Sequence, residues 1–399
     1  MAAPSFAPTM PAPADRLRAA RFARVTAANF FFFLTFASFF LLPLHVRALG
    51  GSERTIGLVM GMSGLSGLAS IAAVGMLLDR FGRRVFLLGG FATMAVATAA
   101  FLVVDRIGPA LFVLRGVQGL AFAAGFNAAS TLAAEFAPPG RRAAALGVFG
   151  VSTLATHALA PALGEQLVHW GGFPALFVAA ALCSVVAVAI AWSLPGGAPP
   201  AAERGVRLRA TPELSSAIAT VSLCGVAFGG VITYVPTFVH DAGLGPVATF
   251  FLSYTAAAVL TRVTAGGLSD TRGRGTVIVP ALGLLAVSIV ILAAARSAAA
   301  LAAAGVLFGT AQGFVYPTLN AFAIDQAESG QLGRAQTLYN GAFNLGVTGG
   351  AMALGPVAEM LGHRSMFLCA AAMAASALVV FALGARWADR ATRAASRGR

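Results

Sequence analysis

The chain has no lysine and few charged residues of any kind. Of its 399 residues, 58% are hydrophobic and 10% are charged, and the mean hydropathy is +0.83. No water-soluble domain of this length reaches such values. The net charge of +13 comes from arginine, and no basic surface with interleaved aromatic residues accompanies it, so we expect no nucleic-acid partner. The composition indicates an integral membrane protein.

Cysteine and catalytic motifs are equally scarce. The three cysteines, Cys183, Cys224 and Cys369, lie in apolar runs at unrelated spacings, which argues against a disulfide framework or a metal site. The sequence has no Walker loop and no Gly-x-Ser-x-Gly turn, and its five histidines are scattered. We therefore expect no enzyme, no metal and no cofactor.

Twelve apolar runs follow one another along the chain. Each has about 20 residues or slightly more, enough to cross a hydrocarbon core of ~30 Å at ~1.5 Å per residue. The fold class predicted is therefore an all-α membrane protein with 12 transmembrane helices. The expected helices are 25–46, 55–78, 84–104, 108–132, 143–164, 173–194, 214–238, 246–268, 276–295, 298–321, 335–358 and 364–386.

Arginine predicts the orientation of these helices. With the amino terminus inside, 20 arginines lie in cytoplasmic segments and five in outer segments. Such an excess is the positive-inside signal, so both termini are expected in the cytoplasm. Residues 1–20, rich in alanine and proline, are expected to form a disordered cytoplasmic terminus.

A duplication divides the chain into two halves. The polar segment 195–212 is predicted to be a cytoplasmic linker between six-helix bundles at 21–194 and 213–387, with a cytoplasmic tail at 388–399. Residues 75–84 recur at 266–275, and three pairs recur in the same order at offsets of 193 to 195: Pro43 with Pro236, Gln118 with Gln312, and Pro161 with Pro356. Two parallel six-helix repeats are an architecture of secondary transporters.

Two motifs resemble those of a known family. Residues 75–84, Gly-Met-Leu-Leu-Asp-Arg-Phe-Gly-Arg-Arg, look like the loop 2–3 signature of the major facilitator superfamily. Residues 115–119, Arg-Gly-Val-Gln-Gly, are similar to its helix-4 signature. The resemblance covers essentially the whole chain and implies two pseudo-symmetric bundles that work by alternating access.

The resemblance also implies a cytoplasmic gate. Asp79, Arg83 and Glu135 would form a charge network beneath the first bundle, and Asp79 would face the amino end of helix 11. Arginines that only set topology are the alternative. The gate candidates, taken from both copies of the loop, are Gly75, Asp79, Arg80, Gly82, Arg83, Arg84, Glu135, Asp270, Gly273 and Arg274.

Ionisable residues within helices are costly and are candidates for proton coupling. Arg115 would, by resemblance, face the interior of helix 4, with a structural role bonding carbonyls as the alternative. His157 can titrate near neutral pH or remain neutral and bonded across helices. Glu165 and Glu359 are candidates at the outer ends of helices 5 and 11, and Arg262 can either function in transport or snorkel to the membrane surface.

Small residues and prolines mark the helices that contact one another closely. Residues 160–165 resemble a degenerate helix-5 antiporter signature that keeps Pro161 and Gly164. Helix 11 has a similar end at Gly355 and Pro356. We expect these four residues to pack helices together.

Uncharged polar residues predict the substrate cavity, because helices 1, 4, 7 and 10 line the cavity in the family, with 2, 5, 8 and 11 beside them. A tyrosine buried with an ordinary partner is the alternative at each tyrosine. The cavity candidates are Asn29, Gln118, Asn127, Tyr234, Tyr254, Gln312, Tyr316, Asn320, Tyr339, Asn340 and Asn344.

Together these features predict a monomeric secondary transporter of the bacterial inner membrane. Its expected function is proton-coupled efflux of a small organic compound. Import of an organic solute, or a sensor that keeps the fold without transport, are the alternatives. The sequence leaves the substrate open.

Overall fold

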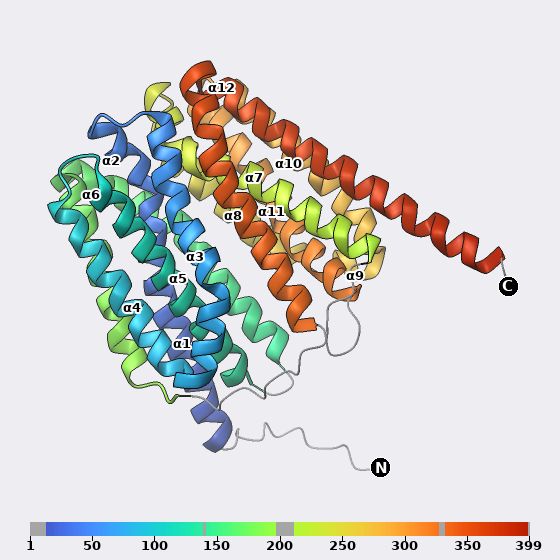
Figure 1. Ribbon diagram of the computed structural model, residues 1–399, viewed down its shortest axis with the longest axis horizontal. Coiled ribbons are helices and arrows are strands. Elements are labelled where there is room, and N and C mark those ends of the chain that lie inside the picture. Colours follow the sequence, from blue (N-terminus) through green and yellow to red (C-terminus); the bar gives the residue numbers. More distant parts are fainter. Residues whose placement is uncertain (1–12, 139–140, 197–210, 327–331, 398–399) are drawn as a thin grey trace, which may run out of the picture.

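The computed structural model describes the backbone of residues 13–138, 141–196, 211–326 and 332–397. Within these ranges the side chains of 13–15, 71–73, 75–76, 78–79, 143, 333 and 385–397 are not described. Every regular element in the described part is a helix (Figure 1). The predicted all-α class is therefore confirmed.

The first half of the chain contains six α-helices and two short 3₁₀ turns. They are α1 (Pro13–Ser38), η1 (Phe39–Leu41), α2 (Leu42–Ala48), α3 (Glu53–Phe81), α4 (Arg83–Ala100), η2 (Phe101–Val103), α5 (Pro109–Phe136) and α6 (Arg142–Trp192).

The second half contains six α-helices. They are α7 (Pro212–Asp241), α8 (Ala248–Ala265), α9 (Leu268–Arg272), α10 (Arg274–Ala294), α11 (Ala298–Asp325) and α12 (Leu332–Arg397).

These elements make twelve membrane crossings. In the described residues, eight helices are long and apolar enough to span a membrane, and α6 and α12 are the longest of them. Both change direction at a glycine in the left-handed region, Gly172 with φ 67° and Gly362 with φ 79°, a conformation that a residue with a Cβ adopts only under strain. Each therefore supplies two crossings, and α3 and α8 complete the twelve (Figure 1).

The first crossing differs from the sequence prediction in two ways. The first helix begins at Pro13, so residues 13–20, expected to be disordered, are helical, while residues 1–12 lie outside the described part. The same crossing tightens into a 3₁₀ turn at 39–41, because Pro43 has no N–H to donate to the carbonyl four residues earlier.

The pattern of helix contacts repeats between the halves. In the first half α1 packs on α6, and α5 on α3 and α4. In the second half α7 packs on α12, and α11 on α8 and α10. The halves meet mainly through α3 against α12 and α6 against α8. This repeated pattern is the two-bundle arrangement that the duplication predicted.

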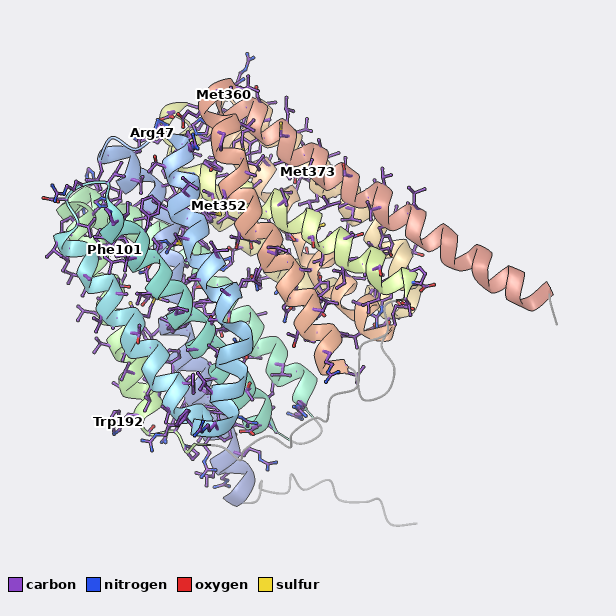
Figure 2. The ribbon with its side chains drawn as sticks, in the orientation of Figure 1. Arg47, Phe101, Trp192, Met352, Met360 and Met373 are labelled. Atoms are coloured by element: carbon purple, nitrogen blue, oxygen red, sulfur yellow. The ribbon has the colours of Figure 1, made fainter. Side chains whose placement is uncertain are left out.

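The two bundles converge at one end and diverge toward the other (Figure 1). We call the converging end, which carries the connections 49–52 and 242–247, the outer end, because the arginine count predicts that it faces outward. The opposite end is the inner end. Figure 2 shows Arg47 and Met360 at the outer end and Trp192 near the inner end.

Glycines bring helices into backbone contact within each bundle. A Cβ on Gly119 would meet the carbonyl oxygen of Ser63 on α3, and a Cβ on Gly309 would meet the carbonyl oxygen of Tyr254 on α8. Close approach through small residues is the usual packing between helices in lipid.

Candidate functional site

The inner loop of the first bundle contains a buried ion pair. Gly82, at φ 85°, turns the chain between α3 and α4 and places Arg83 at the start of α4. Arg83 is 6% exposed and pairs with Glu135 on α5. Arg84 donates to the carbonyl oxygen of Trp192 at 2.7 Å, and Arg80 lies over the ring of Phe81.

The structure brings Arg83 and Glu135 together at the gate predicted by resemblance. Gly75 and Asp79 lie on α3, but their side chains are outside the described part. The role of Asp79 therefore stays a prediction.

The inner loop of the second bundle repeats this geometry. Gly273, at φ 89°, precedes Arg274 at the start of α10. Arg274 pairs with Asp270 and, at 3.1 Å, with Asp325 at the end of α11. Asp325 occupies the place that Glu135 has at the end of α5, and it was absent from our sequence candidates. The sequence could have indicated Asp325, because Glu135 and Asp325 both lie at the carboxyl ends of helices that the internal repeat relates.

The two inner ion pairs differ in burial. The side chain of Arg83 is 7% exposed, whereas that of Arg274 is 27% exposed. Removing one partner of a buried ion pair costs more than removing one partner of a pair that water reaches, because it leaves a buried charge uncompensated. The first pair is thus the more solvent-protected of the two.

Asp79→Asn is predicted to leave expression normal and to reduce transport by about tenfold or more. The reason is the charge network that the resemblance implies for this carboxylate, since a hydrogen bond to a charged group is worth about 1.5–3 kcal/mol. Uptake or release in proteoliposomes, normalised to purified protein, measures the effect, with Asp105→Asn in an exposed outer segment as control. Normal transport by the Asp79 variant would remove this residue from the mechanism.

Arg115 lies in a polar cluster inside the first bundle. It is 3% exposed and donates to Gln118 Oε1 and Ser63 Oγ, both at 2.8 Å. Its guanidinium also lies 5.5 Å from the ring centroid of Phe39, and Gln118 donates in turn to Thr98. The cluster faces α3 and η1 within the bundle. Its geometry fits the structural alternative for Arg115.

At the equivalent place in the second bundle, glycine replaces the arginine of this cluster. Gly309 is the repeat-mate of Arg115, and there the backbones of α8 and α11 leave no room for a side chain. Gln312, the repeat-mate of Gln118, is buried, and in the described part of the structure its Nε2 has no hydrogen-bond partner.

His157 and Tyr254 form a polar contact between the bundles. The Tyr254 hydroxyl lies 3.4 Å from His157 Nδ1, and the edge of the His157 ring meets Phe40 at a centroid distance of 5.0 Å. Arg262, further along α8, lies within electrostatic reach of both. Its Nε has no hydrogen-bond partner in the described residues.

Three of the cavity candidates form one hydrogen-bonded group in the second bundle. Tyr316 on α11 donates to Asn340 Oδ1 on α12 at 2.9 Å, and Tyr339 donates to the carbonyl oxygen of Tyr316 at 2.7 Å. Arg262 is within electrostatic reach of both tyrosines. We call Tyr254, Arg262, Tyr316 and Asn340 the α8–α12 polar group.

The other cavity candidates lie elsewhere. Tyr234 is fully buried at the outer end, where it donates to the carbonyl oxygen of Ala351 at 2.6 Å. Asn29 donates to Thr153 at 2.9 Å, and Asn127 to a carbonyl of its own helix. Hydrogen-bond partners within the protein thus hold these three side chains, and their place in a substrate cavity stays a prediction.

The two remaining candidates lie on α11 and α12. Asn320 is half-buried, and its Oδ1 has no hydrogen-bond partner among the described residues, whereas Asn344 is exposed.

Glu165 and Glu359 both bind backbone of the opposite bundle at the outer end. The Glu165 carboxylate accepts from the backbone N–H groups of Val247, at 2.6 Å, and Ala248, at 2.7 Å. The Glu359 carboxylate accepts from the backbone N–H of Arg54 at 3.0 Å. Each glutamate thus contacts the amino end of a helix of the other bundle.

An ion cluster, missed in the sequence, lies beside these contacts. Arg47 bonds Glu53 and Asp241 at 2.5 Å each, and His363 Nε2 lies 3.2 Å from Glu53. Glu53 is 6% exposed and is the only buried carboxylate in the described residues. Ligand atoms of Glu53, Asp241 and His363 approach within 4.8 Å of one another, but the Arg47 guanidinium already compensates both carboxylates.

The four residues predicted to pack helices together lie on α6 and α12 near the outer end. Gly164 faces Leu41 and Leu176, and a Cβ on Gly355 would meet the carbonyl oxygen of Glu53. Pro161 and Pro356 lie within the same two helices. The small residue at 355, which predicted close helix packing, therefore also marks a contact between the two bundles.

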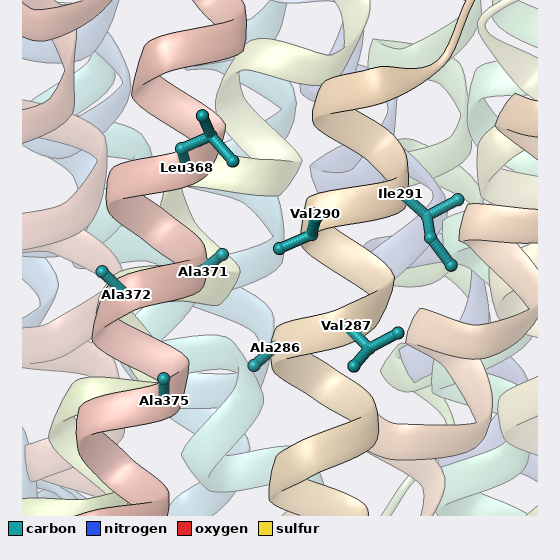
Figure 3. Close-up of a pocket in the computed structure, with 8 residues that line it drawn as sticks. All are labelled: Ala286, Val287, Val290, Ile291, Leu368, Ala371, Ala372 and Ala375. Carbon is teal, nitrogen blue, oxygen red and sulfur yellow. The ribbon is translucent and has the colours of Figure 1, made fainter.

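A cavity on the second bundle involves none of these residues. It lies between α10 and the final part of α12 and is lined by aliphatic side chains only, among them Val287, Val290 and Leu368 (Figure 3). It offers no polar group that could orient a substrate.

Comparisons with known proteins agree with this architecture. The sequence profile of the Major Facilitator Superfamily matches residues 25–257 and 247–399. Inner membrane transport protein YajR of Escherichia coli K12 is 27% identical over 349 residues, which cover 83% of this chain and 75% of YajR.

Solved structures share the fold at low identity. The nucleoside transporter NupG has a TM-score of 0.74 at 14% identity, over 91% of this chain and 98% of NupG. A bacterial homologue of the human lysosomal transporter Spinster has a TM-score of 0.76 at 14% identity, over 92% and 97%. The human organic anion transporter MFSD10 has a TM-score of 0.70 at 16% identity, over 93% and 100%. The chain belongs to the major facilitator superfamily and is a membrane transporter rather than an enzyme.

Proposed function

We propose that this transporter works by alternating access as a proton-coupled exporter of a small organic compound. The observation that carries the alternating access is the position of the contacts between bundles. Every polar contact between the bundles that the structure gives in the described residues involves the outer half of α3, α6, α7, α8 or α12. Toward the inner end the bundles diverge (Figure 1). This is the geometry expected of an inward-open state.

The proposed location is the inner membrane of a bacterium, with both termini in the cytoplasm. The arginine excess on one side supports this orientation. YajR, by its name an inner membrane protein, supports the location.

The α8–α12 polar group supports a site for a substrate with polar groups. Arg262 is a cation whose Nε finds no partner in the described residues, and a charge at membrane depth is retained mostly for function. Tyrosine and asparagine side chains beside it can orient a ligand by hydrogen bonds. Two of the structural neighbours are, by their names, a nucleoside transporter and an organic anion transporter, which is compatible with such a site and does not select a substrate.

His157→Gln is predicted to separate proton-driven transport from exchange. Histidine changes charge near neutral pH and glutamine does not. Accumulation driven by a pH gradient in proteoliposomes should fall by about tenfold or more, while exchange of labelled for unlabelled substrate persists. Phe40→Leu, which changes a ring beside His157 and leaves the imidazole in place, serves as the control. Unchanged proton-driven accumulation would leave His157 a neutral bonded residue.

One experiment tests the direction of transport. A susceptibility and metabolite-accumulation screen of expressing and deleted cells first identifies the compound. Its addition to everted vesicles energised inside-acid should then release protons if export exchanges substrate for protons. Proton movement in the opposite sense would support the importer alternative, and absence of any counter-transport in proteoliposomes would support a sensor.

A further inference from the structure

The two outer glutamates are related by the internal repeat. Glu165 and Glu359 are separated by 194 positions, and so are the residues whose N–H groups they bind, Ala248 and Arg54. Arg47 and Asp241, which pair directly across the interface, are also 194 positions apart. Equivalent positions of the two repeats therefore form these contacts at the outer interface.

The two contacts use repeat-related helices: the fifth crossing corresponds to the eleventh, and the second to the eighth. The carboxylate from the end of the fifth crossing binds the amino end of the eighth, and the carboxylate from the eleventh crossing binds the amino end of the second. The first four N–H groups of a helix have no partner within it and carry partial positive charge. Each carboxylate therefore supplies a partner to the other bundle only while the outer end is closed.

We propose that Glu165 and Glu359 form a duplicated outer lock that stabilises the inward-open state of the transport cycle. They are positioning residues, which hold the bundles together through helix ends and touch no substrate. The proposal rests on the alternating access proposed above. It assigns the two glutamates a role in gating in place of proton carriage.

The surroundings of the two carboxylates predict unequal effects. Glu165 is half-buried and accepts two N–H groups. Glu359 is exposed and accepts one, beside Ser52 and the Arg54 charge. Bonds to a charged group are stronger away from water, so Glu165 should contribute more to the lock than Glu359.

Spin-label distances between outer loops test the proposal without a known substrate. Labels at Arg106→Cys and Arg296→Cys, both exposed and on opposite bundles, report the outer opening in lipid nanodiscs, with native cysteines replaced by serine. Glu165→Gln should raise the open-to-closed ratio by about tenfold, and Glu359→Gln by about threefold. The double variant should give roughly the product, because the two contacts share no partner.

Two further variants make the result decisive. Asp105→Asn removes an exposed carboxylate that has no contact across the interface in the described part, and it should leave the ratio unchanged. Glu165→Asp keeps the charge but is one methylene shorter, so it should open the outer end to an intermediate extent.

The two proposals can fail separately. A Glu165→Gln ratio equal to that of the Asp105 control would overturn the lock, whatever the transport activity. A shifted ratio in a protein that shows no counter-transport would uphold the lock and overturn the proposed function.

Discussion

Gly57→Val is expected to abolish transport while both bundles remain folded. Gly57 lies on α3 where it meets α12, and a Cβ there would meet the carbonyl oxygen of Ala351 and the hydroxyl of Tyr234. Excess volume in a packed interface costs about 1–3 kcal/mol. Because the bundles can separate here, that cost falls on the state with the outer end closed and should lower the ratio of closed to open molecules about 5- to 150-fold.

The same substitution in open space is the matched control. A Cβ on Gly283 of α10 would meet nothing within 4 Å, so Gly283→Val should transport normally. Both variants should show similar thermal unfolding in detergent, because neither valine lies inside a bundle core. Transport by Gly57→Val at the level of the control would contradict the close contact of α3 with α12.

Sequence patterns predicted the features that depend on local chemistry. Apolar length predicted the crossings, and the recurrence of residues 75–84 predicted two inner loops with the same turn, seen in Gly82 and Gly273. Recurrence also predicted that the helices bearing Pro161 and Pro356 are equivalent. These signals are carried by residues that are close together or repeated in the chain.

The outer ion cluster could not be predicted in the same way. Arg47 and Glu53 border a short connection, where charges ordinarily set topology, while Asp241 and His363 lie near two other connections far along the chain. Only the approach of α3, α7 and α12 makes Glu53 a buried carboxylate. For the same reason Tyr234 resembled a substrate ligand in the sequence, although its hydroxyl serves the contact between α7 and α12.

Arg115 offers the sharpest separation of a structural role from a transport role. Arg115→Met is expected to lower the free energy of unfolding by about 2–3 kcal/mol, because it leaves the buried oxygens of Gln118 and Ser63 without their charged donor. Transport per folded molecule should stay near the wild-type level. Arg296→Met, an exposed arginine of the outer segment, is the matched control and should change neither quantity.

A double-mutant cycle identifies the origin of the loss. Removing both partners of a buried polar contact costs less than leaving one unpaired. The free energy of unfolding of the Arg115→Met, Gln118→Met double variant should therefore exceed the value expected from adding the two single losses by about 1–3 kcal/mol. Thermal unfolding in detergent measures stability, and proteoliposomes measure transport. A stable Arg115→Met protein that does not transport would contradict the structural role and would place this guanidinium among the residues that couple proton and substrate.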